Sequence, residues 1–255
     1  DARSAIEALA GRMVGWKVDA KWLMGLRPDR ERWNASWDEA TRAVENAAPT
    51  DAQVLGAVWR KAPRDAVVVC AAGGLPGELH KLWRTHAPGG YHVEYGYSCM
   101  GYEIAGGLGV KMAAPQCEVI VLVGDGSYLM MNSEIATSVM LGMKLVIVVL
   151  DNHGFGCIHR LQQGTGGKPF NNLLADSRHV ELAQVDFAAH AASLGGRSCK
   201  VGGIAELEAA VERARADDRT WVIVIQTDPG SSTTAGGAWW DVPVPEVSDR
   251  EEIRK

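Results

Sequence analysis

From about residue 66 onward, short apolar runs alternate with segments in which apolar residues recur every three or four positions. The runs are typical of buried strands and the recurring segments are typical of helices. The expected strands are Ala66–Cys70, Val119–Val123, Leu145–Leu150, 199–201 and Trp221–Gln226, and the expected helices lie near 77–85, 128–141, 184–194 and 204–216. Such alternation indicates βαβ units. The predicted fold class is therefore α/β, an open and mostly parallel sheet with helices on both faces.

The region before this alternation has a different composition. Residues 1–48 are rich in Ala, Trp and charge and show no strand-like pattern, which predicts one or two helices left from a preceding middle domain or linker. A helix capped by Thr50 or Asp51 then opens the α/β domain that we expect over residues 49–229. Because the chain begins at Asp1 without an initiator Met, we expect it to be part of a longer protein.

Two further segments have no clear periodicity. Residues 153–183 are rich in Gly and Asn, and we expect a long loop there that forms a functional lid or a disordered insert. Residues 230–255 form a C-terminal tail, in which Trp239 and Trp240 are expected to be packing anchors.

Composition limits the classes of function. The 255 residues are 47% hydrophobic, enough for a sizeable core, and a net charge of −5 favours neither nucleic acid nor a polybasic membrane anchor. The apolar runs are far shorter than the roughly 20 residues of a membrane span. The five cysteines form no CxxC pair, so neither a disulfide framework nor a zinc site is predicted, and a cytoplasmic location fits best. We expect the partner to be a small molecule or another protein.

The candidate chemistry lies at the ends of two strands. Gly124–Ser127 follows the strand Val119–Val123, and Asp151–Gly154 follows the strand Leu145–Leu150, with one helix between them. A crossover of this kind commonly makes two parallel strands neighbours. Asp125 would then lie close to Asn152 at the carboxyl edge of the sheet, where open α/β folds bind ligands.

These side chains suit a metal ion and a phosphate group. Mg²⁺ takes oxygen ligands and shares its coordination shell with phosphate oxygens and water, so Asp125 and Asn152 are suitable ligands. Gly126 and Ser127 open the next helix, whose free amides favour a phosphate. A lone Gly-Asp-Gly is common in turns, and its placement after an apolar strand is what favours a metal site.

The arrangement resembles the metal-diphosphate motif of thiamine diphosphate enzymes, with Asp151-Asn152 in place of the commoner Asn-Asn. The resemblance implies that Mg²⁺ is bound by Asp125, Asn152 and the backbone carbonyl of Gly154. His153 is a departure from the pattern of that family. The cofactor contacts that the motif implies are Gly124, Gly126, Ser127 and Asn152.

A second stretch resembles the same family. In Glu94–Tyr102, Met100 occupies the place of the bulky apolar residue that supports the bent cofactor, and the carbonyl of Ser98 would accept a hydrogen bond from the aminopyrimidine. Both contacts would hold the reacting groups of the cofactor close together, which is catalysis by positioning. Upstream, the cluster that follows the first strand would contact the diphosphate through Gly73, Gly74 and Leu75.

The resemblance narrows to one family. Cys99–Gly107, Gly154–Ile158 and Trp239–Pro243 are similar to the trihydroxycyclohexane-1,2-dione hydrolases of myo-inositol catabolism. This implies cleavage of a cyclic diketone at a C–C bond by the thiamine ylide, with a 5-deoxyglucuronate product. It also implies a homodimer or homotetramer. The glutamate that activates the cofactor would lie on a pyrimidine-binding domain of the same or another subunit, so we expect no catalytic residue in this chain, and weak binding without turnover when it is alone.

Other interpretations stay open at this point. The parent could be a carboligase like acetolactate synthase or a decarboxylase of 2-oxo acids, or the chain could be a non-catalytic cofactor-binding module. Met100 could be a core residue, and the glycines at 101, 106, 107 and 109 could serve helix packing. Glu103 is either a buried partner of a backbone donor or a substrate contact. His153 and His159 are the histidines that flank the expected metal turn.

Neither a dehydrogenase nor an NTPase fits the sequence. No GxGxxG follows a strand, and residues 164–169 lack the spacing and the Ser or Thr of a P-loop.

Overall fold

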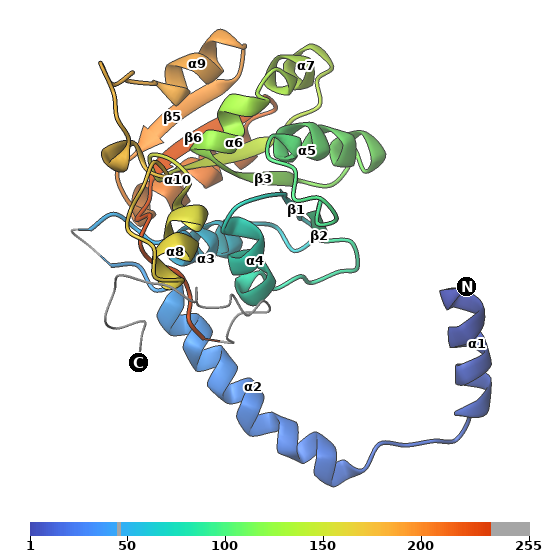
Figure 1. The fold of residues 1–255 in the computed structure, drawn as a ribbon. Coiled ribbons are helices and arrows are strands. Elements are labelled where there is room, and N and C mark those ends of the chain that lie inside the picture. The colour runs from blue at the N-terminus through green and yellow to red at the C-terminus, as the bar shows by residue number, and fades with distance from the viewer. Residues whose placement is uncertain (45–46, 236–255) are drawn as a thin grey trace. The chain divides into compact units, whose positions relative to one another are not determined.

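The structure is a computed structural model that describes residues 1–44 and 47–235 (Figure 1). The expected packing of Trp239 and Trp240 falls outside the described residues. The chain forms two compact units, Asp1–Glu39 and the remainder from Ala40 onward. The main unit therefore includes residues just before 49, because the carbonyls of Thr41 and Arg42 accept hydrogen bonds from Arg60 (3.2 Å) and Gln53 (2.9 Å). The assignment of residues 1–48 to a preceding domain stays a prediction.

The first unit consists of helices. α1 (Ala2–Arg12) begins after Asp1, whose carboxylate accepts the Arg3 N–H at 3.0 Å. α2 (Ala20–Ala40) follows and contains Pro28. Every residue of α1 is exposed.

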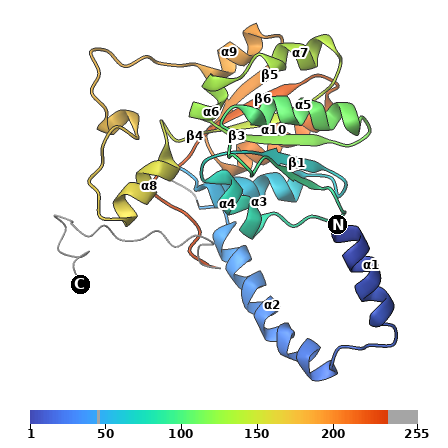
Figure 2. The same ribbon diagram turned by 45° about the vertical axis from the view of Figure 1, so that its right-hand side comes forward.

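The main unit is built on six parallel strands, in the order β2-β1-β3-β4-β6-β5 (Figures 1 and 2). The strands are β1 (Val67–Cys70), β2 (Tyr91–Val93), β3 (Val119–Gly124), β4 (Val146–Asp151), β5 (Arg197–Val201) and β6 (Trp221–Gln226). The predicted α/β class and parallel sheet are confirmed, and so is the pairing of the strand before Asp125 with the strand before Asn152.

Helices cover both faces of the sheet. The helices α3 (Asp51–Lys61), α4 (Leu75–Leu82) and α10 (Ile204–Ala216) lie on one face, and α5 (Tyr102–Ala113), α7 (Glu134–Met140) and α9 (Phe187–Ser193) lie on the other (Figure 2). α3 begins at the capping box of Thr50 and Gln53. Because both faces are covered, every residue of β4 is buried, which explains its uninterrupted apolar sequence.

Three expectations about single elements need correction. The helix expected over 128–141 is two helices, α6 (Asp125–Met130) and α7, because Met131 between them is extended. The three-residue β2 was not expected, since its half-buried residues form no apolar run. The loop expected over 153–183 contains α8 (Gly156–Gly164) and the short 3₁₀ helix η1 (Leu174–Asp176).

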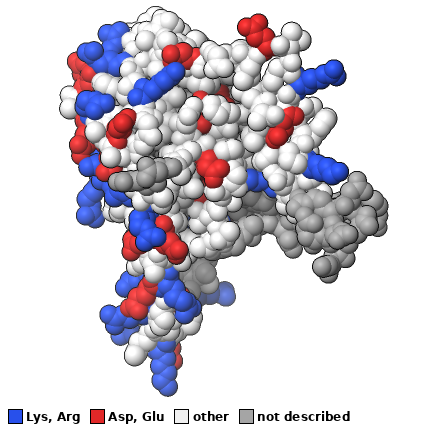
Figure 3. Space-filling view, turned by 90° about the vertical axis from the view of Figure 1, so that its left-hand side faces the viewer, with Lys and Arg blue, Asp and Glu red and all other residues white. Residues whose placement is uncertain are grey.

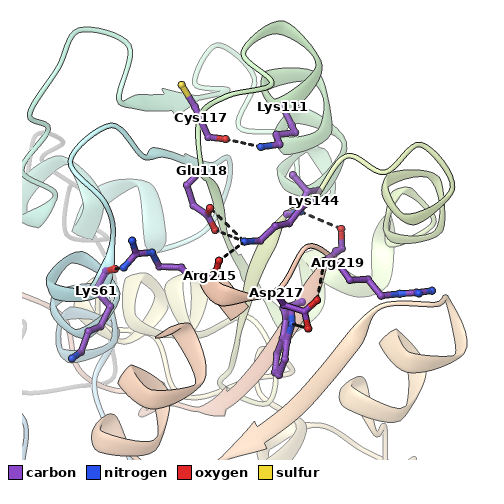
Figure 4. Close-up of polar contacts among 11 residues, drawn as sticks. Lys61, Lys111, Cys117, Glu118, Lys144, Arg215, Asp217 and Arg219 are labelled. Atoms are coloured by element: carbon purple, nitrogen blue, oxygen red, sulfur yellow. Dashed lines mark hydrogen bonds and ion pairs between the residues drawn. The ribbon is translucent and has the colours of Figure 1, made fainter. Parts of the chain in front are cut away.

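The amino edge of the sheet is held by polar contacts among its own residues (Figure 4). Lys144 Nζ lies 3.3 Å from Glu118 Oε1 and donates to the Arg215 carbonyl at 3.0 Å. Arg215 in turn donates to the Lys61 carbonyl at 2.6 Å. These contacts join β3, β4, α10 and α3 at the edge opposite to the candidate site.

The order of the strands reverses between β1 and β3. From β1 the chain moves outward to β2, and it then returns through α5 to β3 on the other side of β1. In open α/β folds, the crevice at such a reversal, outside the carboxyl ends of the strands, is the usual place for a ligand. The segments after β1 and β3 meet there.

Two glycines of α5 differ sharply in their surroundings. A Cβ at Gly107 would overlap Val121 of β3, so the helix reaches the sheet at this residue. A Cβ at Gly109 would meet nothing within 4 Å. The packing interpretation therefore holds for Gly107 and not for Gly109.

We expect Gly107→Ala to lower the free energy of unfolding by about 1–3 kcal/mol, because the added methyl overpacks the contact of α5 with β3. Gly109→Ala in the same helix should raise it by up to about 1 kcal/mol, because alanine favours helix and the methyl is unobstructed. Urea denaturation of both variants measures the difference. Equal effects of the two substitutions would contradict the packing of α5 on β3.

Candidate cofactor and metal site

Asp125 and Asn152 lie at the carboxyl edge of the sheet, as their positions after β3 and β4 predict. Asp125 Oδ2 accepts the backbone N–H of Gly154 at 2.9 Å, which joins the two strand ends. Within the described residues, Asp125 Oδ1 and Asn152 Oδ1 are buried and have no hydrogen-bond partner. Leaving such atoms unpaired costs free energy, so the pair fits a cation that accepts oxygen ligands.

The turn that carries Gly154 is fixed on both sides. Asp151 Oδ1 accepts the His153 N–H at 3.1 Å and lies 3.2 Å from His153 Nδ1, which holds His153 at a φ of 59°. On the far side, Phe155 N–H donates to the Asn172 carbonyl at 2.7 Å, and Leu174 N–H donates to the His153 carbonyl at 2.9 Å. The structure thus gives His153 a role in the turn.

Gly154 itself has no room for a side chain. Its φ is 144°, and a Cβ would overlap the backbone of Asn172 and Leu173. The turn therefore requires glycine at this position.

The charge of Asp125 depends on its surroundings. The pKa of Asp125 is raised to about 6, chiefly by burial and also by the nearby Asp151 carboxylate, while the hydrogen bond from Gly154 opposes the rise. A cation bound beside Asp125 would lower the pKa of this carboxyl group, since it favours the ionised carboxylate.

Met100 lies beside the Gly-Asp-Gly segment and is not a core residue. Its side chain is 36% exposed, and its Cε is 3.6 Å from where a Cβ of Gly126 would lie. The Phe155 ring approaches the same point to 2.7 Å. Ser98 lies in the exposed segment just before Met100 and adopts a φ of 51°. The structure therefore brings the side chains of Met100 and Phe155 together beside Gly126, at the solvent-accessible surface.

The loop after β1 lies against the side chain of Arg160. Gly73 has a φ of 82°, Gly74 is the N-cap of α4, and Leu75 is buried. A Cβ at Gly74 would overlap the guanidinium of Arg160 and would lie 3.7 Å from Asp51 Oδ2. Gly74 thus leaves space for Arg160, which no sequence pattern indicated.

Arg160 reaches this loop from α8. Its Nη1 donates to the Pro229 carbonyl at 2.8 Å and lies 3.4 Å from where a Cβ of Gly156 would be. The nearby Asp51 is 5% exposed, and burial raises its pKa to about 6 although the charge of Arg160 partly opposes the rise. The sequence suggested Asp51 only as a helix cap, and Thr50 takes that role.

Ser127 and Glu103 are engaged with protein groups. Ser127 Oγ donates to Glu103 Oε1 at 2.7 Å and accepts the Gly101 N–H at 2.8 Å. Glu103 is 1% exposed and accepts backbone N–H groups, which fits a buried partner of backbone donors. Any ligand contact of Ser127 is therefore left to its backbone.

His159 lies in α8 and is buried. Its Nδ1 is 3.4 Å from Asp176 Oδ2, and its Nε2 contacts Gln163 Nε2. These contacts join α8 to η1. His159 therefore links the two helical pieces of the segment that was expected to be a loop.

The surface near α8 is rich in uncharged residues. Figure 3 views the side that carries the segment after α8, and charged side chains are scattered there over a largely uncharged surface. Exposed apolar side chains of α8 and the residues around it include Phe155, Ile158, Phe170, Val180 and Leu182. Exposed apolar surface of this kind is typical of a ligand or protein contact.

Other candidate sites are weaker. A hollow of about 220 Å³ at the opposite edge of the sheet is lined in part by Ser138, Arg197 and Lys144, and Lys144 is already paired with Glu118. Among the described residues, three or more His, Cys, Asp or Glu side chains nowhere gather as a metal site made by protein alone. Every helix in the described residues is too short or too polar to cross a membrane.

The fold and the site together define a class of protein. A parallel α/β domain carries unpaired oxygen atoms and glycine-rich loops at the reversal of its strand order. Residues 71–225 match the family described as "Thiamine pyrophosphate enzyme, C-terminal TPP binding domain". The chain belongs to this family.

Individual relatives narrow the comparison. The chain is 37% identical to 3D-(3,5/4)-trihydroxycyclohexane-1,2-dione hydrolase of Halalkalibacterium halodurans, over 100% of this chain and 44% of the relative. It is 41% identical to the hydrolase of the same name from Bacillus subtilis, over 76% of this chain and 30% of the relative. The predicted resemblance to these hydrolases is thus confirmed. The chain spans less than half the length of either relative.

A solved structure supports the fold. The chain is similar to the thiamine diphosphate-dependent 4-hydroxybenzoylformate decarboxylase of Rhodococcus jostii RHA1, with a TM-score of 0.64 and 23% identity. The match covers 73% of this chain and 34% of that chain. At this identity the similarity concerns the fold alone.

Asp51 gives the stability of the domain a dependence on pH. A pKa raised from 3.8 to about 6 means that the folded state holds a proton that the unfolded chain has released. We expect the free energy of unfolding to fall by up to about 3 kcal/mol between about pH 4 and about pH 6 through this group. Asp51→Asn should remove this contribution to the slope of the free energy of unfolding against pH. Urea denaturation at several pH values across this range measures that slope.

The exposed Asp65 provides the control, because Asp65→Asn should leave the slope unchanged. Asp125 titrates in the same range, so the Asp51 variant keeps part of the slope. A slope that does not differ between Asp51→Asn and the unaltered chain would contradict the buried environment of Asp51.

Proposed function

We propose that the main unit binds Mg²⁺ and the diphosphate of thiamine diphosphate, as part of a hydrolase that cleaves a C–C bond of trihydroxycyclohexane-1,2-dione. The observation that carries the proposal is the pair of buried, unpartnered oxygens of Asp125 and Asn152. Asp125 follows β3 at the strand reversal and Asn152 follows the neighbouring strand β4, in a chain of the thiamine pyrophosphate family. The named relatives suggest the substrate.

The chain's own residues would divide the binding. Asp125, Asn152 and the Gly154 carbonyl would hold the cation, and the remaining coordination positions would go to diphosphate oxygens and water. The backbone amides of Gly73–Leu75 and Gly124–Ser127 would contact the diphosphate, with Asn152 beside them. Small residues in these segments let the backbone approach a charged group closely.

Met100 and Ser98 would orient the organic part of the cofactor. When bound, thiamine diphosphate supplies the nucleophilic carbon and the electron sink for C–C cleavage. The half-exposed Met100, beside Gly126, would support the bent form, and the Ser98 carbonyl would accept a hydrogen bond from the aminopyrimidine. Their contribution is orientation of the reacting groups.

The rest of the active site would come from elsewhere. We propose that the activating glutamate belongs to a pyrimidine-binding domain of the same or another subunit, in a homodimer or homotetramer. The exposed apolar residues of α8 and the following segment fit such a contact. On this proposal the present chain binds the cofactor weakly and does not turn over alone.

Calorimetric titration of the chain with Mg²⁺ and thiamine diphosphate tests the proposal. Asp125→Ala should weaken binding by about a hundredfold or more, because it removes a charged ligand. Asp65→Ala, at the amino end of β1, is the control and should bind as the unaltered chain does. Binding should also weaken about tenfold from pH 7.5 to pH 5, because protons compete for Asp125, whose pKa is about 6.

Unchanged affinity in Asp125→Ala would refute the metal assignment. The substrate is tested separately in the whole enzyme, where turnover of the cyclic dione is compared with that of pyruvate. Preference for pyruvate would favour a 2-oxo acid carboligase or decarboxylase, and cofactor binding without either activity would favour a binding module.

A further inference from the structure

One buried carboxylate connects three segments of the site. Glu103 Oε2 accepts the Gly101 N–H at 3.0 Å. Its Oε1 accepts the Ser127 hydroxyl at 2.7 Å and the Ala72 N–H at 3.4 Å. Ser127 Oγ also accepts the Gly101 N–H at 2.8 Å, so the contacts form a closed network.

The three donors come from distant parts of the sequence. Ala72 lies in the loop after β1, Gly101 directly follows Met100, and Ser127 ends the Gly124–Ser127 segment at the end of β3. Glu103, near the start of α5, therefore lies where the two sides of the strand reversal meet. These are the segments proposed to contact the diphosphate and the organic part of the cofactor.

The chemistry of Glu103 fits a link between these segments. An ionised carboxylate only accepts hydrogen bonds, and all three neighbours donate. Burial raises the pKa of Glu103, and the hydrogen bonds from Ser127, Ala72 and Gly101 oppose that rise. At 1% exposure the side chain has no surface for a substrate. Any effect on the reaction must therefore pass through the residues it holds.

The neighbourhood of Gly101 makes this link tight. Gly101 has a φ of 91°, and a Cβ there would lie 3.1 Å from Met131 Cβ. Its N–H has two acceptors, Glu103 and Ser127. The position of Met100, one residue earlier, is thus coupled to the segment that carries Asp125.

We infer that Glu103 is a positioning residue that fixes Met100 relative to the metal and diphosphate segments. The inference rests on the proposed function for its cofactor, although the link between the segments is a property of the chain itself. Glu103 would determine how well the two halves of thiamine diphosphate are bound at once. Its influence on the diphosphate half would be smaller, because it holds Ser127 and Ala72 of the diphosphate segments but not the proposed metal ligands Asp125 and Asn152.

The test compares two probes on the chain with Glu103→Gln, which keeps the shape but replaces one acceptor by a donor. Calorimetry with Mg²⁺ and inorganic pyrophosphate reports the diphosphate half, and calorimetry with Mg²⁺ and thiamine diphosphate reports both halves. We expect thiamine diphosphate affinity to fall about tenfold and pyrophosphate affinity to fall clearly less, by about two- to threefold, because Glu103 also holds Ser127 and Ala72 of the diphosphate segments. Glu78→Gln, at a buried glutamate of α4 that accepts from Thr233, should leave the ratio of the affinities unchanged.

Amide hydrogen exchange of the chain without ligand gives a second measurement. Peptides that contain Ala72 and Gly101 should exchange faster in Glu103→Gln than in the unaltered chain. If Glu103→Gln does not fold, Ser127→Ala carries the same comparison, because it removes one acceptor of the Gly101 N–H.

An equal loss of both affinities would overturn the inference and indicate a general structural role. Unchanged exchange at Ala72 and Gly101 would overturn it whatever happens to binding. If the unaltered chain binds neither probe, the proposed function fails, and faster exchange in Glu103→Gln would still support the link between the three segments.

Discussion

The parallel pairing of β1, β3 and β4 is the constraint on which the rest of the molecule depends. Both faces of these strands are covered by helices, so their residues are buried and their register is fixed by packing. The same pairing places the residues that follow each strand at one edge. The segments after β1 and β3 are about fifty positions apart in the sequence. They meet because packing of the buried strands, and not local sequence, aligns them.

Polar groups at that edge are satisfied in different ways. Glu103 is surrounded by donors from its own chain, whereas Asp51 lies near a guanidinium and keeps an unpaired oxygen. One oxygen of Asp125 accepts a hydrogen bond from Gly154, and the other has no partner among the residues that the structure describes. Carboxylates that look alike in the sequence therefore have unlike tasks, and the difference lies in which donors the fold brings to each.

The sequence alone predicts much of this architecture. The apolar strands and the polar residues after β3 and β4 could be located because burial on both faces gives uninterrupted apolar runs. β2 and α8 could not, since Tyr91–Val93 is half-buried at an edge and α8 has few apolar positions. The sequence also could not predict the neighbours of Glu103 and Arg160, because each contact joins residues from separate segments of the chain. Gly109 and Gly107 look equivalent in sequence, and only the position of β3 separates them.

The turn that contains His153 and Gly154 is held by hydrogen bonds to Asp151, Asp125 and the segment Asn172–Leu174. Its shape is therefore complete without any bound ion. An ion arriving there would meet ligands already in place and would lose little affinity to ordering of the chain. Its departure would likewise leave the turn folded. On the proposed function, the ion would then be a replaceable component of the site rather than a structural one.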